Sequence, residues 1–313
     1  MAFLSKAVGR IEPSPTVAVT TRANELKAEG RDIIGLGAGE PDFAVPEHAR
    51  EAAIQAVRDG KSKYTAPDGT PELKDAVRAK FKRENGLDFT RDEVTINVGG
   101  KHSIFNAFMA TIDAGDEVII PAPYWVSYPD VVQFAGGTPV FIRAGAEQGF
   151  KITPAQLEAA ITPRTKWFVF NSPSNPTGAA YTRGEIEALI AVLRRHPHVW
   201  IMADDIYEHI TYEDFEFFTV AQLAPDLAGR TLTVNGASKA YSMTGWRIGY
   251  AAGPRELMRA IAKLQSQSTT NPCAIAQEAA RAALEGPEQP FPVGGRHAEA
   301  GIGDGDQCLI APA

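Results

Sequence analysis

Apolar side chains recur along the first part of the chain at helical spacing. Residues 46–60 and 71–84 both show this pattern, and both stretches begin with proline. Between them lies KYTAPDGTP (63–71), whose prolines and glycine are typical of a loop. The pattern therefore predicts two helices joined by a loop.

From residue 94 onwards, short apolar runs alternate with helical stretches. Strands are expected over 94–98, 117–120, 139–142, 166–170, 199–203 and 231–234, with helices over 101–112, 128–135, 154–161 and 183–195. The runs WFVF and VWIMA are almost continuously apolar, as strands are when both faces of a sheet are covered. This order predicts an α/β fold with a mostly parallel sheet flanked by helices.

The stretch 286–313 is rich in Gly and Pro and shows neither helical nor strand periodicity. We expect a disordered or aberrant tail there, the alternative being an irregular segment docked on the body.

Composition narrows the classes of function. The 313 residues include 31 Lys and Arg against 38 Asp and Glu, for a net charge of −7. Such an acidic balance offers no broad basic surface, so nucleic acid is not an expected partner. The two cysteines suggest neither a disulfide framework nor a zinc site, and we expect no metal. No apolar run is long enough to span a membrane, and no secretory signal is evident, so the cytoplasm is the expected location.

Four polar clusters each follow a predicted strand. They are NVGGKHS (97–103), NSPSNPTG (171–178), ADDIYE (203–208) and GASKAYSMTGWRIGY (236–250). Each cluster alone is also compatible with an ordinary turn, a helix cap or a solvated surface. Ligands of parallel sheets bind beyond the carboxyl ends of the strands, so we expect the four clusters to meet in one site.

The residue types in these clusters indicate a particular chemistry. Two glycines before a helix let backbone N–H groups approach an anion. Asp204 can pair with a ligand cation, and the Tyr207 hydroxyl can donate to a ligand oxygen. Lys239 lies among small and apolar residues, which lower the pKa of an amine and make it nucleophilic. An amine that captures an aldehyde, together with Arg247 for a phosphate, suggests pyridoxal 5′-phosphate, although Lys239 and Arg247 could also be surface cations.

Further motifs complete a family pattern. They are GAGEPDF (37–43), KYTAPDGTPELK (63–74), PYWVSYP (123–129), NPTG (175–178), DDIY (204–207) and SKAYSMTGWRIGY (238–250). In combination the chain resembles the fold-type I pyridoxal-phosphate enzymes of the class I/II aminotransferase family, closest to the bacterial aspartate aminotransferases. The resemblance covers about residues 1–285. It implies a large domain with a seven-stranded type of sheet over 46–285 and an N-terminal segment of a small domain over 1–45.

The resemblance also implies roles for the catalytic residues. Lys239 would form the Schiff base with the cofactor and then act as general acid and base. Asp204 would keep the pyridine nitrogen protonated, while Tyr207 and Asn175 would hydrogen-bond the phenolic oxygen. Trp125 would stack on the ring of the cofactor.

The remaining implied residues bind the phosphate or the substrate. Gly100, Lys101, Ser238 and Arg247 would hold the phosphate, with Tyr64 contributed by the second subunit of a homodimer. The substrate would contact Gly39, Trp125 and Asn175, and Lys101 would bind a distal carboxylate of an acidic substrate. The implied reaction is transamination between an amino acid, expected to be L-aspartate, and 2-oxoglutarate.

The sequence departs from the family pattern after about Leu284. The family's later segment completes the small domain and carries an arginine for the substrate α-carboxylate. We therefore expect an incomplete small domain, and cofactor binding with weak or absent transamination. Three alternatives stay open: prephenate or aromatic keto acids as acceptors, a pyridoxal-phosphate lyase or synthase, and a non-catalytic remnant that binds the cofactor.

Overall fold

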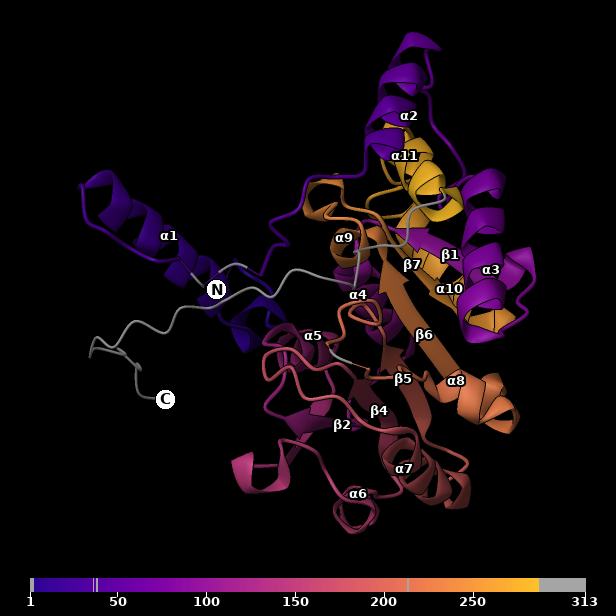
Figure 1. Cartoon of the computed structure of the whole chain (residues 1–313). Coiled ribbons are helices and arrows are strands. Elements are labelled where there is room, and N and C mark those ends of the chain that lie inside the picture. Colours follow the sequence, from indigo (N-terminus) through magenta and orange to yellow (C-terminus); the bar gives the residue numbers. More distant parts are fainter. Residues whose placement is uncertain (1–2, 36, 38, 213, 287–313) are drawn as a thin grey trace.

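A seven-stranded sheet lies at the centre of the computed structural model, which describes residues 3–35, 37, 39–212 and 214–286 (Figure 1). Its strands follow the order β1-β7-β6-β5-β4-β2-β3. The strands are β1 (Val94–Asn97), β2 (Glu117–Ala122), β3 (Thr138–Arg143), β4 (Thr165–Asn171), β5 (Trp200–Asp204), β6 (Thr231–Gly236) and β7 (Gly249–Ala252). Strands β2 to β6 pair in parallel, whereas β7 runs antiparallel to β1 and β6. The predicted mostly parallel sheet is thus confirmed, with one antiparallel strand that the sequence did not predict.

The six predicted helices all occur, with ends close to those expected. The helices are α1 (Pro15–Ala28), α2 (Glu47–Arg58), α3 (Pro71–Asn85), α4 (Gly100–Thr111), α5 (Ser127–Ala135), α6 (Pro154–Ala160), α7 (Arg183–Arg195), α8 (Val220–Leu223), α9 (Ala237–Ala240), α10 (Arg255–Ser266) and α11 (Ala274–Glu285). Local chemistry fixes several ends. The Thr70 hydroxyl accepts from the Leu73 N–H at the start of α3, and Gly86 ends that helix with a φ of 67°.

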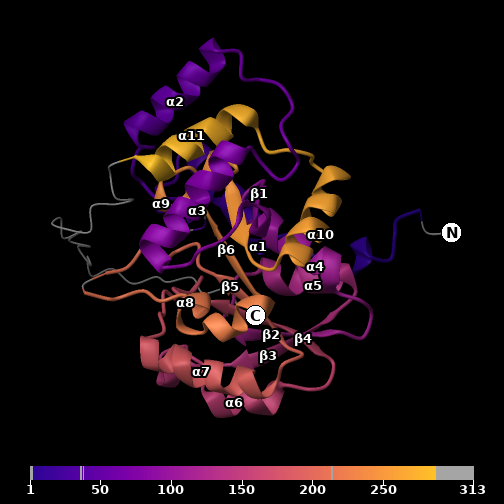
Figure 2. The same ribbon diagram turned by 90° about the vertical axis from the view of Figure 1, so that its right-hand side faces the viewer.

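Helices cover both faces of the sheet, which explains why its strands are apolar on both sides. In β4, Phe168 and Phe170 pack against α6, α7 and α8, while Trp167 and Val169 pack in the core under α4, α5 and α10. Figure 2 shows α6 and α7 on one side of the sheet and α4 and α5 on the other. Each such buried side chain stabilises the fold by about 1.5–3 kcal/mol.

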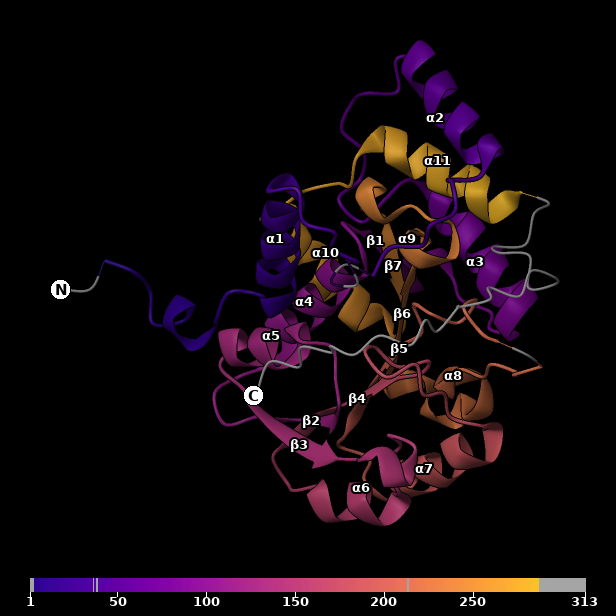
Figure 3. The same cartoon turned by 60° about the vertical axis from the view of Figure 1, so that its left-hand side comes forward.

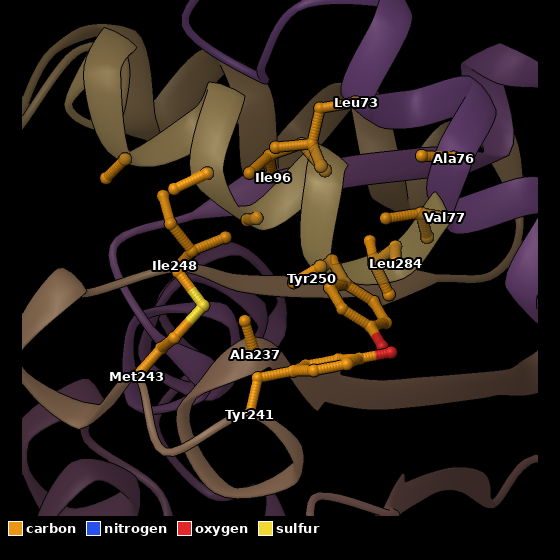
Figure 4. Packing of buried hydrophobic residues seen from close by; sticks show 14 of the residues in the cluster. Leu73, Ala76, Val77, Ile96, Ala237, Tyr241, Met243, Ile248, Tyr250 and Leu284 are labelled. Atoms are coloured by element: carbon orange, nitrogen blue, oxygen red, sulfur yellow. The ribbon is translucent and has the colours of Figure 1, made fainter. Parts of the chain in front are cut away.

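A third core joins α2, α3 and α11 to the β1–β7 end of the sheet. Figure 4 shows Leu73 and Val77 of α3 facing the same core as Ile96, Tyr250 and Leu284. The segment after β6 closes this core from below, because Ala237, Tyr241 and Met243 are all buried in it (Figure 4). This anchoring positions the turn that carries Lys239.

Helix α1 lies apart from the sheet in Figure 1, although it overlaps α4 and α10 in the turned view of Figure 3, and it has no buried residue. The preceding 3₁₀ turn, Val8–Arg10, contacts α5, where Arg10 Nη1 donates to the Gln133 carbonyl at 3.4 Å. The division of the chain at residues 45 and 285 stays a prediction, and the predicted tail lies outside the described residues except for Gly286. None of the described helices is long and apolar enough to cross a membrane.

Candidate active site

The four polar clusters meet at one edge of the sheet, as the parallel strand order requires. Asn171 and Asp204 are register partners at the ends of β4 and β5, and Asn171 Nδ2 donates to the Asp204 carbonyl at 2.8 Å. Gly236 and Gly249 are partners at the end of β6 and the start of β7. A Cβ on Gly249 would collide with the backbone of Gly99 and Gly100, so the turn after β1 lies against them.

Asp204 is the buried acid of the site, with 5% of its surface exposed. Its carboxylate accepts a hydrogen bond from the Tyr128 hydroxyl at 2.5 Å and one from the Ile206 N–H at 3.4 Å. Both donors are neutral. Burial therefore raises the pKa of Asp204 to about 6, although the Tyr128 hydrogen bond opposes the rise. A cationic ligand group beside this carboxylate would offset the free-energy cost of burying its negative charge.

Tyr207 and Asn175 form a second polar pair above Asp204. Asn175 Nδ2 donates to the Tyr207 hydroxyl at 3.1 Å, and the Asn175 N–H donates to Asn171 Oδ1 at 2.8 Å. Burial raises the pKa of Tyr207, and the Asn175 hydrogen bond partly offsets this. The pair can thus present a neutral hydroxyl and an amide to a ligand oxygen.

Lys239 occupies α9, directly after β6. Its ammonium donates to the Gly39 carbonyl and lies 5.8 Å from the centre of the Tyr207 ring. Burial lowers the pKa of Lys239, and the nearby Arg247 acts in the same direction, whereas Glu40 opposes both. A lowered pKa makes the free amine more available as a nucleophile, as the sequence predicted.

An anion cradle forms where α4 begins. Gly99 has a φ of 83°, a conformation that favours glycine, and a Cβ there would collide with the guanidinium of Arg247. Arg247 is itself in the left-handed region with a φ of 55°, and its Nη1 donates to the Thr244 carbonyl at 2.7 Å. The N-terminus of the twelve-residue helix α4 adds free N–H groups near this guanidinium. Ser238 is buried at the start of α9, next to Lys239.

Two pockets open at this edge. Gly39, Asn175 and Tyr207 share a pocket of about 540 Å³ that Tyr212 and Phe215 also line. Lys101 and Arg247 line the neighbouring one. The Lys101 ammonium lies 4.9 Å from the centre of the Trp125 ring, and burial together with Arg247 lowers the pKa of Lys101.

Tyr64 is the predicted site residue that the structure keeps apart from the others. It is 91% exposed and lines a separate pocket with Thr270 and Cys273. Two buried glutamines hold its loop: Gln277 Oε1 accepts from the Thr70 N–H at 2.8 Å, and Gln265 Nε2 donates to the Pro67 carbonyl. The loop is thus fixed while the Tyr64 side chain faces solvent.

Sequence reasoning missed Tyr128 and Asn171. Tyr128 lies in the quoted stretch PYWVSYP but has no assigned role there, although it is 2% exposed and donates to Asp204. The available signal is its position three residues after Trp125, in the turn that leads into α5, where the Tyr128 N–H donates to the Trp125 carbonyl at 3.1 Å. The two rings meet edge to face at 5.3 Å. Asn171 ends an apolar strand, and that is the only hint of its role.

These residues fit pyridoxal 5′-phosphate on structural grounds. A buried carboxylate with only neutral donors can pair with a protonated ring nitrogen, and a partly buried amine of lowered pKa can bind an aldehyde. The glycine turn, the helix N-terminus and Arg247 can hold a phosphate. Together these groups form a site in an α/β fold whose chemistry fits that cofactor.

Comparison with known proteins agrees with this description. The family model described as aminotransferase class I and II matches residues 31–292. The aspartate/prephenate aminotransferase of Cereibacter sphaeroides is 65% identical over 289 residues, which cover 92% of this chain and 72% of that protein. A probable aspartate/prephenate aminotransferase of Rhizobium leguminosarum is 57% identical over 93% of this chain and 73% of its own length.

Solved structures show the same fold. The crystal structure of the aspartate aminotransferase from Rhizobium meliloti superimposes with a TM-score of 0.88 at 55% identity, over 92% of this chain and 72% of that one. The aspartate aminotransferase from Thermus thermophilus with maleate gives 0.87 at 51% identity, over 91% and 73%. The chain belongs to the class I and II aminotransferase family, and membership implies pyridoxal 5′-phosphate as its cofactor.

The unusual pKa of Asp204 predicts a pH dependence of stability in the cofactor-free protein. The folded pKa of about 6 exceeds the ordinary value of 3.8, so the folded state binds the proton more tightly. The Asp204 contribution to the free energy of unfolding therefore falls as the pH rises through this interval, by about 3 kcal/mol in total. In urea unfolding from pH 4 to 7, Asp204→Asn should gain stability relative to the unaltered protein by most of this amount, about 2.4 kcal/mol. Parallel curves for the two proteins would contradict the assignment.

Proposed function

We propose that this protein transfers the amino group of L-aspartate to 2-oxoglutarate, with pyridoxal 5′-phosphate bound covalently through a Schiff base to Lys239. The observation that carries the proposal is the convergence of a buried acid, a Tyr–Asn pair and a nucleophilic lysine at one sheet edge. The 65% identity to an aspartate/prephenate aminotransferase supports the same reaction class.

Bound pyridoxal 5′-phosphate supplies an aldehyde that captures amines and a ring that accepts the electrons freed when the substrate loses its Cα proton. Lys239 Nζ would hold the cofactor through its aldehyde. The free amine of Lys239 would take the proton from the substrate Cα and later return it as general acid. Its lowered pKa favours the neutral form that this step needs.

The other residues hold the ring and its charge. Asp204, anchored by Tyr128, would keep the proton on the ring nitrogen, because a cation beside the buried carboxylate offsets the cost of burying its charge. Tyr207 and Asn175 would bind the phenolic oxygen, and Trp125 would pack against the ring. The Gly100 N–H, the Ser238 hydroxyl, Lys101 and Arg247 would bind the phosphate.

The cationic side chains at the site favour the binding of acidic substrates. Gly39 and Asn175 line one pocket with Tyr207, while Lys101 lines another with Arg247. We propose that the two ends of a short dicarboxylate occupy these two positions. The neighbouring Thermus structure contains maleate, which is such a dicarboxylate. We therefore assign the distal carboxylate of aspartate to Lys101 and the remaining contacts to Gly39, Trp125 and Asn175.

Lys101→Ser tests this assignment. We expect kcat/KM for aspartate to fall about thirtyfold, the equivalent of about 2 kcal/mol for an unpaired carboxylate. With pyridoxal phosphate at saturating concentration, so that the lost contact to its phosphate affects all substrates alike, the value for alanine or phenylalanine should fall much less, because these substrates lack the second carboxylate. Steady-state kinetics on both substrate types measures the difference, and an equal loss for both would overturn the role of Lys101.

Prephenate is a second candidate acceptor. Curated relatives at 57–65% identity bear the name aspartate/prephenate aminotransferase, some of them qualified as probable. Prephenate also carries two carboxylates, so the same cations can bind it. Aspartate with prephenate should therefore give an aminated product alongside the 2-oxoglutarate reaction.

We further propose a homodimer in which Tyr64 reaches the phosphate of the partner's cofactor. Support comes from its 91% exposure on a loop that Gln265 and Gln277 hold rigidly. Tyr64→Phe should weaken cofactor binding about tenfold, since a buried hydrogen bond to a charged group contributes roughly 1.5 kcal/mol. In the mixed dimer of one Tyr64→Phe subunit and one Lys239→Ala subunit, the site that keeps Lys239 receives the intact Tyr64 if Tyr64 acts across the interface, and it should bind the cofactor with unaltered affinity. A tenfold weaker affinity at that site would contradict this arrangement.

Product analysis tests the reaction class itself. Aspartate and 2-oxoglutarate should yield oxaloacetate and glutamate in equal amounts. Ammonia and pyruvate instead would indicate the lyase alternative, and cofactor binding without any product would indicate a non-catalytic remnant. The cytoplasmic location stays a prediction from composition.

A further inference from the structure

A buried polar cluster lies beneath the site and joins three segments of the fold. It consists of Lys80 and Asn85 from α3, Glu208 from the turn after β5, and Asn235 near the end of β6; we call it the Lys80–Glu208 cluster. Lys80 is fully buried, and the other three are at most 7% exposed. A Lys–Glu pair at this depth is rare in a core and needs a physical reason.

The carboxylate of Glu208 is the centre of the cluster. Glu208 Oε1 accepts from the Lys80 ammonium and from Asn235 Nδ2 at 2.6 Å, and Oε2 accepts from Asn85 Nδ2 at 3.1 Å. Lys80 Nζ also donates to Asn85 Oδ1 at 2.9 Å. Both charges are thus paired and hydrogen-bonded. Even so, burying such a pair contributes little net stability, because desolvation offsets the attraction.

The cluster connects the two segments that carry the proposed chemistry. Glu208 directly follows Tyr207 and lies four residues after Asp204. Asn235 Oδ1 accepts from the Gly236 N–H at 2.7 Å, and Gly236 caps α9, which holds Lys239. The Glu208 carboxylate therefore ties the Asp204–Tyr207 turn to the turn that delivers Lys239.

The alternative interpretation of the acidic residues around Glu208 is a metal site. Glu84, Glu208 and His209 offer ligand atoms within 4.8 Å of one another. However, Lys80 contacts Glu208 and its Nζ lies 3.4 Å from Glu84 Oε2, so an ammonium already supplies the positive charge there. The cluster is better explained as a structural link than as a cation site.

We infer that Glu208 is a positioning residue for the proposed reaction: its carboxylate, neutralised by Lys80, fixes Tyr207 and Lys239 relative to each other through Asn235. The inference rests on the proposed function, because it concerns the geometry of the same site. A displacement of about 1 Å in such a site costs on the order of a hundredfold in rate.

Three variants of the full chain test it. Glu208→Gln keeps the side-chain shape but leaves the Lys80 charge buried and unpaired. Lys80→Met/Glu208→Gln removes both charges, so it leaves no unpaired charge buried in the core. This double variant can therefore be tested even if Glu208→Gln alone does not fold. Asn235→Ala cuts the link on the β6 side while the Lys80–Glu208 pair stays intact.

Glu117→Gln is the matched control. Glu117 is another buried carboxylate, 5% exposed, which accepts from Arg164 and Thr162. It lies at the first residue of β2, the end of the sheet opposite to the site. Its loss should lower stability without affecting the cofactor.

The readouts are the dissociation constant of pyridoxal phosphate, the pH midpoint of the Lys239-dependent absorption band, and kcat. For the double variant and for Asn235→Ala we expect cofactor binding to be about tenfold weaker and kcat to be about a hundredfold lower. The pH midpoint of the absorption band should also shift in both variants. For Glu117→Gln, affinity and midpoint should stay unchanged.

Failure of the positioning role can be distinguished from failure of the proposed function. Unchanged affinity, midpoint and kcat in both the double variant and Asn235→Ala would overturn the positioning role alone, leaving a purely structural cluster. A missing Lys239-dependent band in the unaltered protein would overturn the proposed function, and the positioning role with it.

Discussion

Lys239→Ala is expected to reduce transamination from aspartate by at least about 10⁴-fold, because in the proposed reaction this one residue supplies both the nucleophile and the proton transfer. The surroundings of Lys239 are compatible with both roles. The amine lies next to Tyr207 and Gly39 at the pocket, and burial lowers its pKa. Steady-state kinetics with aspartate and 2-oxoglutarate, coupled to oxaloacetate detection, measures the loss.

Lys263→Ala provides the control for this change. Lys263 is an exposed lysine on α10, and its replacement should leave the rate unchanged. Added methylamine is expected to restore part of the activity of Lys239→Ala, since a free amine can take over the proton transfer. Retention of more than a tenth of the activity without added amine would contradict the central role of Lys239.

Asp204→Asn should lower kcat by about 10³-fold, the size of effect seen when one preorganised electrostatic partner is lost. The amide keeps the shape of the side chain, and its oxygen can still accept from Tyr128. The amide lacks the negative charge that, in the proposed mechanism, holds the proton on the ring nitrogen. The expected result is therefore a large loss in kcat together with weaker cofactor binding, as measured by kinetics and equilibrium dialysis.

Glu117→Gln separates this electrostatic role from the general cost of losing a buried carboxylate. It should lower the melting temperature while kcat changes less than about threefold, because Glu117 lies at the opposite end of the sheet. Tyr128→Phe tests the anchor of Asp204 and should give a smaller loss than Asp204→Asn. Asp204→Asn with near-normal kcat would refute the role of the acid.

Much of this site could be predicted from the sequence because its parts are local. The turn at Gly99 and Gly100, the acid at the end of β5 and the lysine after β6 each stand at a recognisable strand end. A parallel sheet then brings them together without further information. Helices such as α3 could likewise be predicted from local caps, with Pro71 at the start and Gly86 at the end.

Several of the parts that the sequence analysis did not predict depend on distant contacts. Tyr128 donates to Asp204 across 76 residues, and Lys80 meets Glu208 across 128, so no local pattern pairs them. Strand β7 has the short sequence GYAA, and its extended conformation comes from pairing with both β1 and β6. Helix α1 has no apolar stripe to bury, which is why its sequence gave no helical signal.

The absorption spectrum of the purified protein with pyridoxal phosphate, measured beside Lys239→Ala, tests the central claim most directly. The account predicts a band in the near-ultraviolet or visible region that depends on Lys239 and shifts when aspartate is added. A spectrum identical to that of Lys239→Ala, or a Lys239-dependent band that is indifferent to aspartate and other amino acids, would contradict it.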